Sequence, residues 1–214
     1  MGAETWAIVV AGGEGRRFGR LKQFALLGDR PVLDWSLETA RSVAFGVVAV
    51  VPEATMSTSG VARGADRVMA GGKTRAESVR RGLAAVPDDA EIVVVHDAAR
   101  PLASRELFLA VVAEVEAGSD CAIPALPVTD TIKRVRDDRV VETLRREELV
   151  AVQTPQAFRA SILRRAHASS PEATDDAALV EAVGATVTVV AGEYRNMKLT
   201  SPEDLLTAER WLAR

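Results

Sequence analysis

The chain has 214 residues, a net charge of −3, 48% hydrophobic residues and one cysteine, Cys121. This length and hydrophobic content suffice for one sizeable core, so we expect a single α/β domain over 1–214. No apolar run reaches membrane-spanning length, no N-terminal signal pattern is present, and a pI near 5.6 argues against general nucleic-acid binding. One cysteine gives no disulfide framework, so we expect a cytoplasmic protein with no membrane or nucleic-acid partner.

The first predicted strand, residues 6–10, is an apolar run that leads directly into a glycine-rich turn with Gly12, Gly13 and Gly15. Glycine lets the backbone adopt positive φ angles and approach a ligand closely. Four basic residues and no acid follow within 16–22. A strand that leads into a glycine turn and then a basic loop favours a polyanion site, where backbone N–H groups and cationic side chains bind phosphate oxygens.

Two common phosphate-binding motifs are excluded. The dinucleotide fingerprint G-x-G-x-x-G needs a third glycine at the position that Phe18 occupies. The segment 72–74, Gly-Lys-Thr, resembles the end of a P-loop, but Arg67 stands where the first glycine of that motif belongs. The sequence therefore predicts neither a dinucleotide-dependent dehydrogenase nor a P-loop kinase.

The first half of the chain alternates apolar runs with amphipathic stretches, which is typical of βαβ units. A polar turn, His96 to Pro101, follows the most strand-like run. Ligands bind at the carboxyl ends of strands in open parallel sheets, so we expect this turn to face the same crevice as the glycine turn. The predicted strands are 46–51, 67–70 and 91–95, and the predicted helices are 31–41, 74–86 and a third that Ser104 caps and that ends near 117.

A strongly charged segment follows a predicted strand at 121–126. Ten of the seventeen residues from 130 to 146 are charged, and Asp137-Asp138 at the centre suits a turn. The flanks are β-branched but too polar to bury both faces. We therefore expect a hairpin arm within 128–148 that projects from the domain. An isolated hairpin is only marginally stable in water, so a second copy of the chain is the simplest expected support.

The rest of the chain returns to the domain. Ser201-Pro202-Glu203-Asp204 is a strong N-terminal signal for a last helix through Trp211. The other expected elements are strands 150–152 and 186–191, helices 160–168 and 177–183, and an extended segment at 196–200.

These polar turns, in this order, resemble one family, the 2-C-methyl-D-erythritol 4-phosphate cytidylyltransferases of the non-mevalonate isoprenoid pathway. The glycine turn alone would indicate only a nucleotidyltransferase of the nucleotide-diphospho-sugar transferase type. The matching segments span almost the whole chain: AGGEGRRFG (11–19) with Lys22-Gln23, GGKTRAESV (71–79), HDAARP (96–101), DTIKR (130–134), Arg146, TPQAF (154–158), TDDAA (174–178) and NMKLTSPEDL (196–205).

The resemblance implies a Rossmann-like, three-layer α/β fold with a mostly parallel central sheet and a projecting β-hairpin arm. It also implies an enzyme that transfers the CMP moiety of CTP to 2-C-methyl-D-erythritol 4-phosphate, giving 4-diphosphocytidyl-2-C-methyl-D-erythritol and pyrophosphate. Two departures stand out. Arg20-Leu21 precedes Lys22 where similar proteins usually have a proline in a longer loop, and Lys73 stands where relatives often have an acid.

The same resemblance assigns roles to individual residues. For the basic loop, the alternative interpretation is a solvated surface, and for Gly71-Gly72 it is an ordinary turn before a helix. The implied catalytic residues are Arg17, Lys22 and Lys198, and the implied CTP-binding residues are Ala11, Gly12, Gly13, Arg17, Lys22, Gly72 and Ser78.

The residues implied for the alcohol phosphate have alternatives too. Asp97 and Arg100 could form a structural ion pair, and Asp97 could hold a metal. Thr174 could instead be a helix N-cap, and His96 is interpreted as structural. The implied substrate-binding residues are Asp97, Arg100, Thr131, Arg146, Thr154, Thr174 and Lys198.

The resemblance further implies a homodimer in which the arm reaches the neighbouring subunit and completes its site. Mg²⁺ is expected to arrive with CTP, held mainly by phosphates and water, because the sequence has no metal-ligand cluster. Three other functions remain open. They are transfer to another alcohol phosphate such as ribitol 5-phosphate, a sugar-phosphate or molybdenum-cofactor nucleotidyltransferase, and a non-catalytic nucleotide-binding protein.

Overall fold

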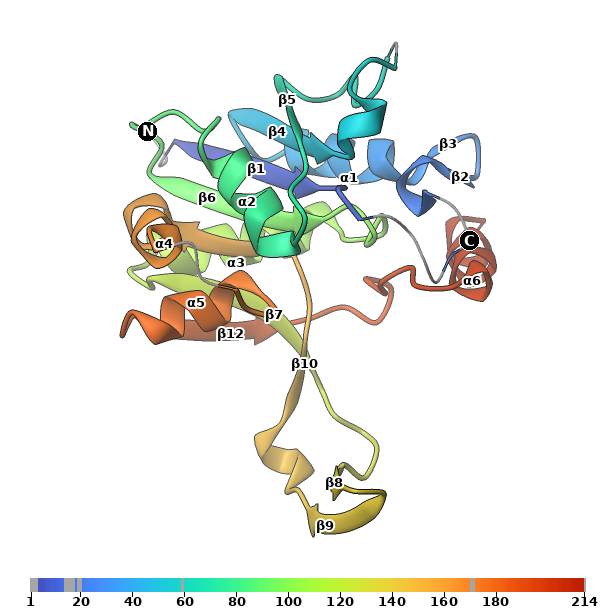
Figure 1. Ribbon diagram of the computed structural model, residues 1–214, viewed down its shortest axis with the longest axis vertical. Coiled ribbons are helices and arrows are strands. Elements are labelled where there is room, and N and C mark those ends of the chain that lie inside the picture. Colours follow the sequence, from blue (N-terminus) through green and yellow to red (C-terminus); the bar gives the residue numbers. More distant parts are fainter. Residues whose placement is uncertain (1–3, 14–17, 19–20, 59, 170–171, 214) are drawn as a thin grey trace.

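A mostly parallel β-sheet, covered by helices on both faces, forms the body of the molecule, and a long hairpin extends away from it (Figure 1). The computed structural model describes residues 4–13, 18, 21–58, 60–169 and 172–213. The predicted α/β fold with a projecting arm is confirmed. No helix in these described ranges is both long and apolar enough to cross a membrane.

In the main sheet, the hydrogen-bonded pairs follow the path β10-β7-β11-β6-β1-β4-β5, and β12 pairs in parallel with β7. Strands β1, β4, β5 and β6 run parallel to one another, whereas β11 runs antiparallel to both of its neighbours. The strands are β1 (Thr5–Val10), β4 (Gly46–Val51), β5 (Arg67–Ala70), β6 (Ile92–Asp97), β7 (Cys121–Pro127), β10 (Val150–Val152), β11 (Gln156–Arg159) and β12 (Val187–Ala191).

Helices on both faces explain why the central strands are apolar throughout rather than alternating. Every residue of β4 and β6 is buried. One hydrophobic cluster packs side chains of α1 (Val32–Arg41) and α3 (Arg105–Glu116) against the sheet. A second cluster packs α2 (Arg75–Leu83), α4 (Ala160–His167) and α5 (Asp176–Ala182) against the opposite face.

The helix starts follow the capping signals in the sequence, with one correction. The Ser104 side chain accepts a hydrogen bond from the Leu107 N–H at 3.0 Å, as predicted. Helix α6 (Pro202–Leu212) begins with a capping box between Ser201 and Asp204. At α5, however, the N-cap is Asp175 and not Thr174, because the Asp175 carboxylate accepts from the Ala178 N–H.

Strands β10 and β11 lie one after the other along the same edge of β7. Val152 pairs with Ala125 and Ala157 pairs with Ala122, so the four residues 153–156 stand opposite only two residues of β7. The sequence analysis predicted β10 but no strand at 156–159. This irregularity places the buried side chain of Thr154 beside the end of β6.

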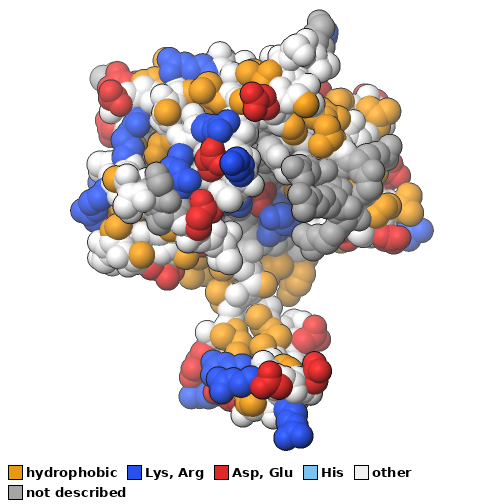
Figure 2. All heavy atoms as spheres, in the orientation of Figure 1, with side chains coloured by type: hydrophobic (Ala, Val, Ile, Leu, Met, Phe, Trp, Pro, Cys, Tyr) orange, Lys and Arg blue, Asp and Glu red, His pale blue; other side chains and the backbone are white. Residues whose placement is uncertain are grey.

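The arm spans residues 128–148 and contains a hairpin of β8 (Lys133–Arg136) and β9 (Arg139–Thr143), which are joined by Asp137 and Asp138. Both turn residues have positive φ, 48° and 58°, which a two-residue hairpin turn requires. Figure 2 shows charges of both signs on the arm, with hydrophobic side chains among them. The smaller elements are two-residue strands β2 (Leu26–Leu27) and β3 (Arg30–Pro31), and 3-10 turns η2 (Lys22–Phe24), η3 (Glu53–Thr55) and η4 (Arg146–Glu148).

Candidate active site

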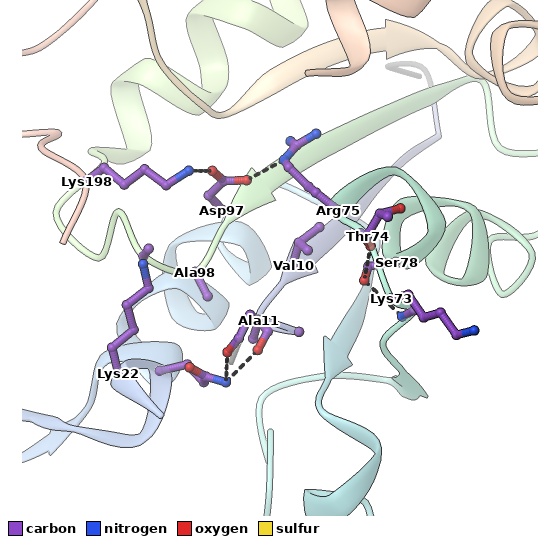
Figure 3. A pocket seen from close by; sticks show the side chains of 15 residues that line it. Val10, Ala11, Lys22, Lys73, Thr74, Arg75, Ser78, Asp97, Ala98 and Lys198 are labelled. Carbon is purple, nitrogen blue, oxygen red and sulfur yellow. Dashed lines mark hydrogen bonds and ion pairs between the residues drawn. The ribbon is translucent and has the colours of Figure 1, made fainter. Parts of the chain in front are cut away.

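A cavity of about 510 Å³ opens where β1 and β6 end (Figure 3). The glycine turn after β1 and the polar turn after β6 face this one crevice, as the sequence predicted. The described residues that line the cavity are Val10, Ala11, Gly12, Gly13, Lys22, Gln23, Gly72, Lys73, Thr74, Arg75, Ser78, Asp97, Ala98, Ala99 and Lys198.

Close backbone packing shapes the glycine side of the cavity. A Cβ atom on Gly12 would lie 3.1 Å from the Ser78 hydroxyl oxygen, and one on Gly71 would lie 3.2 Å from the Gly12 Cα atom. The Ser78 hydroxyl accepts from the Gly72 N–H at 3.0 Å and donates to the Thr74 carbonyl at 2.9 Å. Gln23 donates to the carbonyl oxygens of Ala11 and Gly13 from the other side. Hydrogen bonds to the carbonyl oxygens of Ala11 and Gly13 thereby help to fix the described part of the turn.

Two lysines reach the cavity from opposite ends of the sequence. The Lys22 Nζ atom donates to the Leu199 carbonyl at 2.8 Å, so it sits beside the segment that carries Lys198. That segment is itself attached to the polar turn, because the Leu199 N–H donates to the Ala99 carbonyl at 2.7 Å. The structure thus brings Lys22 and Lys198 to one cavity although 176 positions separate them.

Asp97, the last residue of β6, lies between two cations. Its Oδ2 atom is 2.7 Å from Lys198 Nζ, and its Oδ1 atom is 3.0 Å from Arg75 Nε. Burial opposes ionisation of Asp97, but the charges of Arg75 and Lys198 outweigh it and hold the pKa of this carboxyl well below its usual range. Asp97 is therefore a carboxylate at any physiological pH.

Comparison with known proteins gives a family match over nearly the whole chain. The family model for IspD, 2-C-methyl-D-erythritol 4-phosphate cytidylyltransferase, matches residues 5–214. The chain belongs to this family. A 2-C-methyl-D-erythritol 4-phosphate cytidylyltransferase of Frankia casuarinae is 46% identical, covering 97% of this chain and 81% of the relative. One from Rubrobacter xylanophilus is 45% identical, covering 97% and 94%.

Solved IspD-family structures share the fold over nearly the whole chain. The 2-C-methyl-D-erythritol 4-phosphate cytidylyltransferase of Thermus thermophilus superposes with a TM-score of 0.81 at 37% identity, covering 97% of this chain and 98% of the other. The 4-diphosphocytidyl-2C-methyl-D-erythritol synthase of Anaerococcus prevotii gives a TM-score of 0.86 at 32% identity, with complete coverage of both chains.

Eight of the residues that the IspD resemblance implied line the cavity: Ala11, Gly12, Gly13, Lys22, Gly72, Ser78, Asp97 and Lys198. Arg17 lies outside the described residues. The side chain of Lys73, one of the two departures from the resemblance, extends away from Lys22 and Lys198 (Figure 3). Its backbone N–H is instead bound by the Glu77 carboxylate at 2.7 Å.

Arg100 and Thr154 do not line the cavity but form hydrogen bonds with the segments around it. Arg100 donates to the carbonyl oxygens of Asn196 and Val152 rather than pairing with Asp97, so the alternative of an Asp97–Arg100 ion pair is not what the structure shows. The Thr154 hydroxyl accepts from the Asp97 N–H at 3.0 Å and lies 3.1 Å from His96 Nδ1. Their contacts with substrate remain predictions.

The other three implied substrate residues lie outside this cavity. Thr131 and Arg146 belong to the arm, and both are exposed. Arg146 donates to the Thr129 carbonyl at 2.7 Å. Thr174 is exposed just before α5. Within one chain, then, the cavity gathers the described residues implied for CTP, while most of those implied for the alcohol phosphate lie behind it or on the arm.

Arg75 was missed by the sequence reasoning, although it lies in a matching segment. Its guanidinium contacts Asp97 and also the fully buried Asp176, at 2.7 Å. Burial opposes its charge, but the two carboxylates outweigh that effect and raise the pKa of Arg75 further. One signal in the sequence could have found it: Arg75 is a basic residue at the first position of α2, soon after the Gly72 turn. A helix N-terminus favours anions, so a basic residue there suggests an anion-binding site.

His96 is fully buried, and burial lowers its pKa to about 4. The Arg100 carbonyl can only accept, so Nε2 carries the proton and Nδ1 accepts from the Thr154 hydroxyl. His96 is therefore neutral at pH 7, in agreement with its interpretation as a structural residue.

This shift predicts an acid-sensitive fold. The unfolded chain binds a proton on His96 below about pH 6.5 and the native chain does not, so stability rises with pH through this range. The unfolding free energy should fall by about 1.4 kcal/mol per pH unit between about pH 6.5 and 4 from this group alone. Urea unfolding of wild type and His96→Gln at several pH values tests this: the variant should show a shallower slope, and an equal slope would contradict the assignment.

Proposed function

We propose that the protein transfers the CMP group of CTP to 2-C-methyl-D-erythritol 4-phosphate and releases pyrophosphate, as the names of its relatives describe. One observation carries the proposal. In a chain that matches the IspD family model over residues 5–214, the glycine turn, Lys22 and the Asp97–Lys198 pair line a single cavity at the carboxyl ends of β1 and β6.

The reaction needs positioning and charge stabilisation more than proton transfer. An oxygen of the alcohol phosphate forms a bond to the α-phosphorus of CTP, and the bond from that phosphorus to the bridging oxygen breaks. Pyrophosphate leaves with the electron pair. We assign Lys22 and Lys198 to the negative charge that builds up around the α-phosphate. Arg17 is assigned to the CTP triphosphate from the sequence and its resemblance.

The buried acid and base groups fit a step without proton transfer. Asp97 is held ionised by its two cations, and His96 is neutral with both ring nitrogens engaged. Asp97 is available to accept hydrogen bonds from hydroxyl groups of the alcohol, as the resemblance implies. The glycine turn presents backbone N–H groups to the CTP phosphates.

Mg²⁺ is part of this proposal as a companion of CTP. Among the described residues that line the cavity, Asp97 is the only carboxylate, and each of its oxygens already contacts a cation. The described residues also contain no cluster of three His, Cys, Asp or Glu side chains arranged to hold a metal. The cavity therefore suits a metal bound through triphosphate oxygens and water, which would neutralise phosphate charge.

We also propose a homodimer in which each arm completes the site of its neighbour. Thr131 and Arg146 lie on the arm, outside the cavity of their own chain. Val135, Val140 and Val141 on the same arm are 56%, 60% and 52% exposed. Apolar side chains on a projecting hairpin favour contact with another chain. An arginine such as Arg146 can then bind the phosphate of the alcohol in a two-point contact. We place the protein in the cytoplasm, since one cysteine offers no internal disulfide.

The test is pyrophosphate release with CTP and Mg²⁺, offering methylerythritol phosphate and ribitol 5-phosphate in parallel, with ATP, GTP and UTP as controls. We expect CTP-dependent turnover of methylerythritol phosphate. Turnover of ribitol phosphate alone would replace the proposed acceptor. Absence of turnover with both acceptors would refute the proposal and favour a nucleotide-binding protein without catalysis.

A further inference from the structure

The charges at Asp97 continue as an alternating chain into the protein interior. Lys198 pairs with Asp97, Asp97 with Arg75, and Arg75 Nη1 with Asp176 Oδ2 at 2.7 Å. The chain ends on His167, whose Nε2 atom is 2.9 Å from Asp176 Oδ1. The Asp176 and His167 side chains are 0% and 3% exposed, whereas Lys198 at the other end is 40% exposed and lines the cavity.

We propose that Asp176 and His167 are positioning residues for nucleotidyl transfer. They hold Arg75, and Arg75 holds Asp97 and thereby Lys198. The proposal deepens the function proposed above and rests on it. The five residues come from five separate segments: α2, β6, α4, α5 and the segment after β12. Neither Asp176 nor His167 lines the cavity.

Arg75 needs a fixed partner because the proposed substrates, which carry phosphate groups, compete for its guanidinium. A guanidinium is a planar fork that binds phosphate readily, and Arg75 is 23% exposed on the cavity wall. Two phosphorylated substrates would pull an unanchored Arg75 toward themselves and away from Asp97. Asp176 opposes this pull, because an ion pair with a fully buried carboxylate is little weakened by solvent. With Nη1 held, Nε stays on Asp97 Oδ1, and Oδ2 remains aimed at Lys198.

His167 has a matching role at the end of the chain. A buried carboxylate is costly unless both oxygens are hydrogen-bonded. Arg75 satisfies one oxygen of Asp176, and His167 Nε2 satisfies the other. Because the carboxylate accepts, Nε2 carries the proton. His167 Nδ1 has no hydrogen-bond partner in the described part of the chain, so its polar contact is the one to Asp176. A purely structural cluster is the competing interpretation, and the experiment separates the two.

The first variant is Asp176→Asn, which keeps the shape and removes the charge. We expect kcat to fall by about 10- to 100-fold, because small misplacements of catalytic groups cost up to about 10²-fold. The KM for CTP should change less than about threefold, because Lys22 and the glycine turn are untouched. Glu38→Gln is the matched control. It removes the negative charge of Glu38 on α1, which forms an exposed ion pair with Arg30, and its kcat should stay within about twofold of wild type.

A second readout does not depend on activity. Hydrogen exchange of the Arg75 Nε–H, followed by ¹⁵N NMR, should be slow in wild type and much faster in Asp176→Asn. If wild-type protein shows no cytidylyl transfer, the proposed function fails while this exchange measurement still reports on the anchor. Wild-type kcat in a folded Asp176→Asn variant would overturn the positioning role. Slow Arg75 exchange in that variant would overturn the anchoring.

His167 supplies a test that survives if Asp176→Asn does not fold. His167→Gln keeps an N–H donor, whereas His167→Leu keeps only bulk. We expect His167→Gln to retain kcat within about fivefold of wild type, and His167→Leu to lose at least about tenfold while remaining folded by circular dichroism. Equal kcat in the two variants would show that only packing matters and would overturn the proposal.

Discussion

Replacing Lys22 by Ala is expected to lower kcat by about 10²- to 10³-fold, because removing one preorganised donor from developing charge costs this much in other enzymes. The fold should survive. The variant loses the hydrogen bond from Lys22 Nζ to the Leu199 carbonyl, and one such bond is worth about 1 kcal/mol. Steady-state kinetics with CTP and methylerythritol phosphate, together with urea unfolding, separate the two effects.

Two companion variants sharpen the Lys22 result. Lys22→Arg keeps a cation and should recover part of the lost kcat. Lys73→Ala removes a cation from the same cavity wall, but its side chain extends away from Lys22 and Lys198, so its effect should be at least about tenfold smaller (Figure 3). If Lys22→Ala turned over CTP at a rate near that of wild type, Lys22 would have no catalytic role.

Mixing two inactive variants is expected to restore activity. Arg146→Ala should lose about 10²-fold in kcat/KM for the alcohol phosphate, because a charged group that binds phosphate is removed. In a dimer of Lys22→Ala with Arg146→Ala, arm exchange places both defects in one site and leaves the other site intact. Random mixing of subunits in a two-fold dimer should then recover about a quarter of wild-type activity.

The mixing experiment needs subunit exchange, so the two variants are best unfolded and refolded together. Each variant refolded alone is the control. Light scattering gives the size of the active species. A mixture no more active than its components, or a fully active monomer at assay concentration, would refute completion of the site by the neighbouring arm.

Local sequence patterns predicted most of the fold. The apolar runs at 6–10 and 46–51 became central strands because helices cover both of their faces, and the cap at Ser104 and the capping box at Ser201 mark helix starts. Strand β11 was not predicted. Its four residues follow a proline, and what makes them a strand is pairing with β6 and β7, far away in the sequence.

The candidate site, too, contains residues that the sequence identified and residues that it did not. The family resemblance, carried by the sequence motifs, located Gly12, Gly13, Lys22, Asp97 and Lys198, which all line the cavity. It did not find Arg75 between Asp97 and Asp176, because these partners are 22 and 101 residues away. The N-cap of α5 was misplaced by one residue for a different reason. Thr174 and Asp175 are both good caps, and only the packed helix decides between them.

The close meeting of the two glycine turns has a genetic consequence. Gly12, Gly71 and Ser78 touch one another so tightly that a methyl group on either glycine would force its neighbours to move by a few tenths of an ångström. The three positions therefore form one mutational unit. In a library randomised at all three, larger residues should be recovered at one position only when a compensating change accompanies them at another. The close contact among these three residues, which shapes one side of the cavity, thus also limits which substitutions can accumulate at these positions.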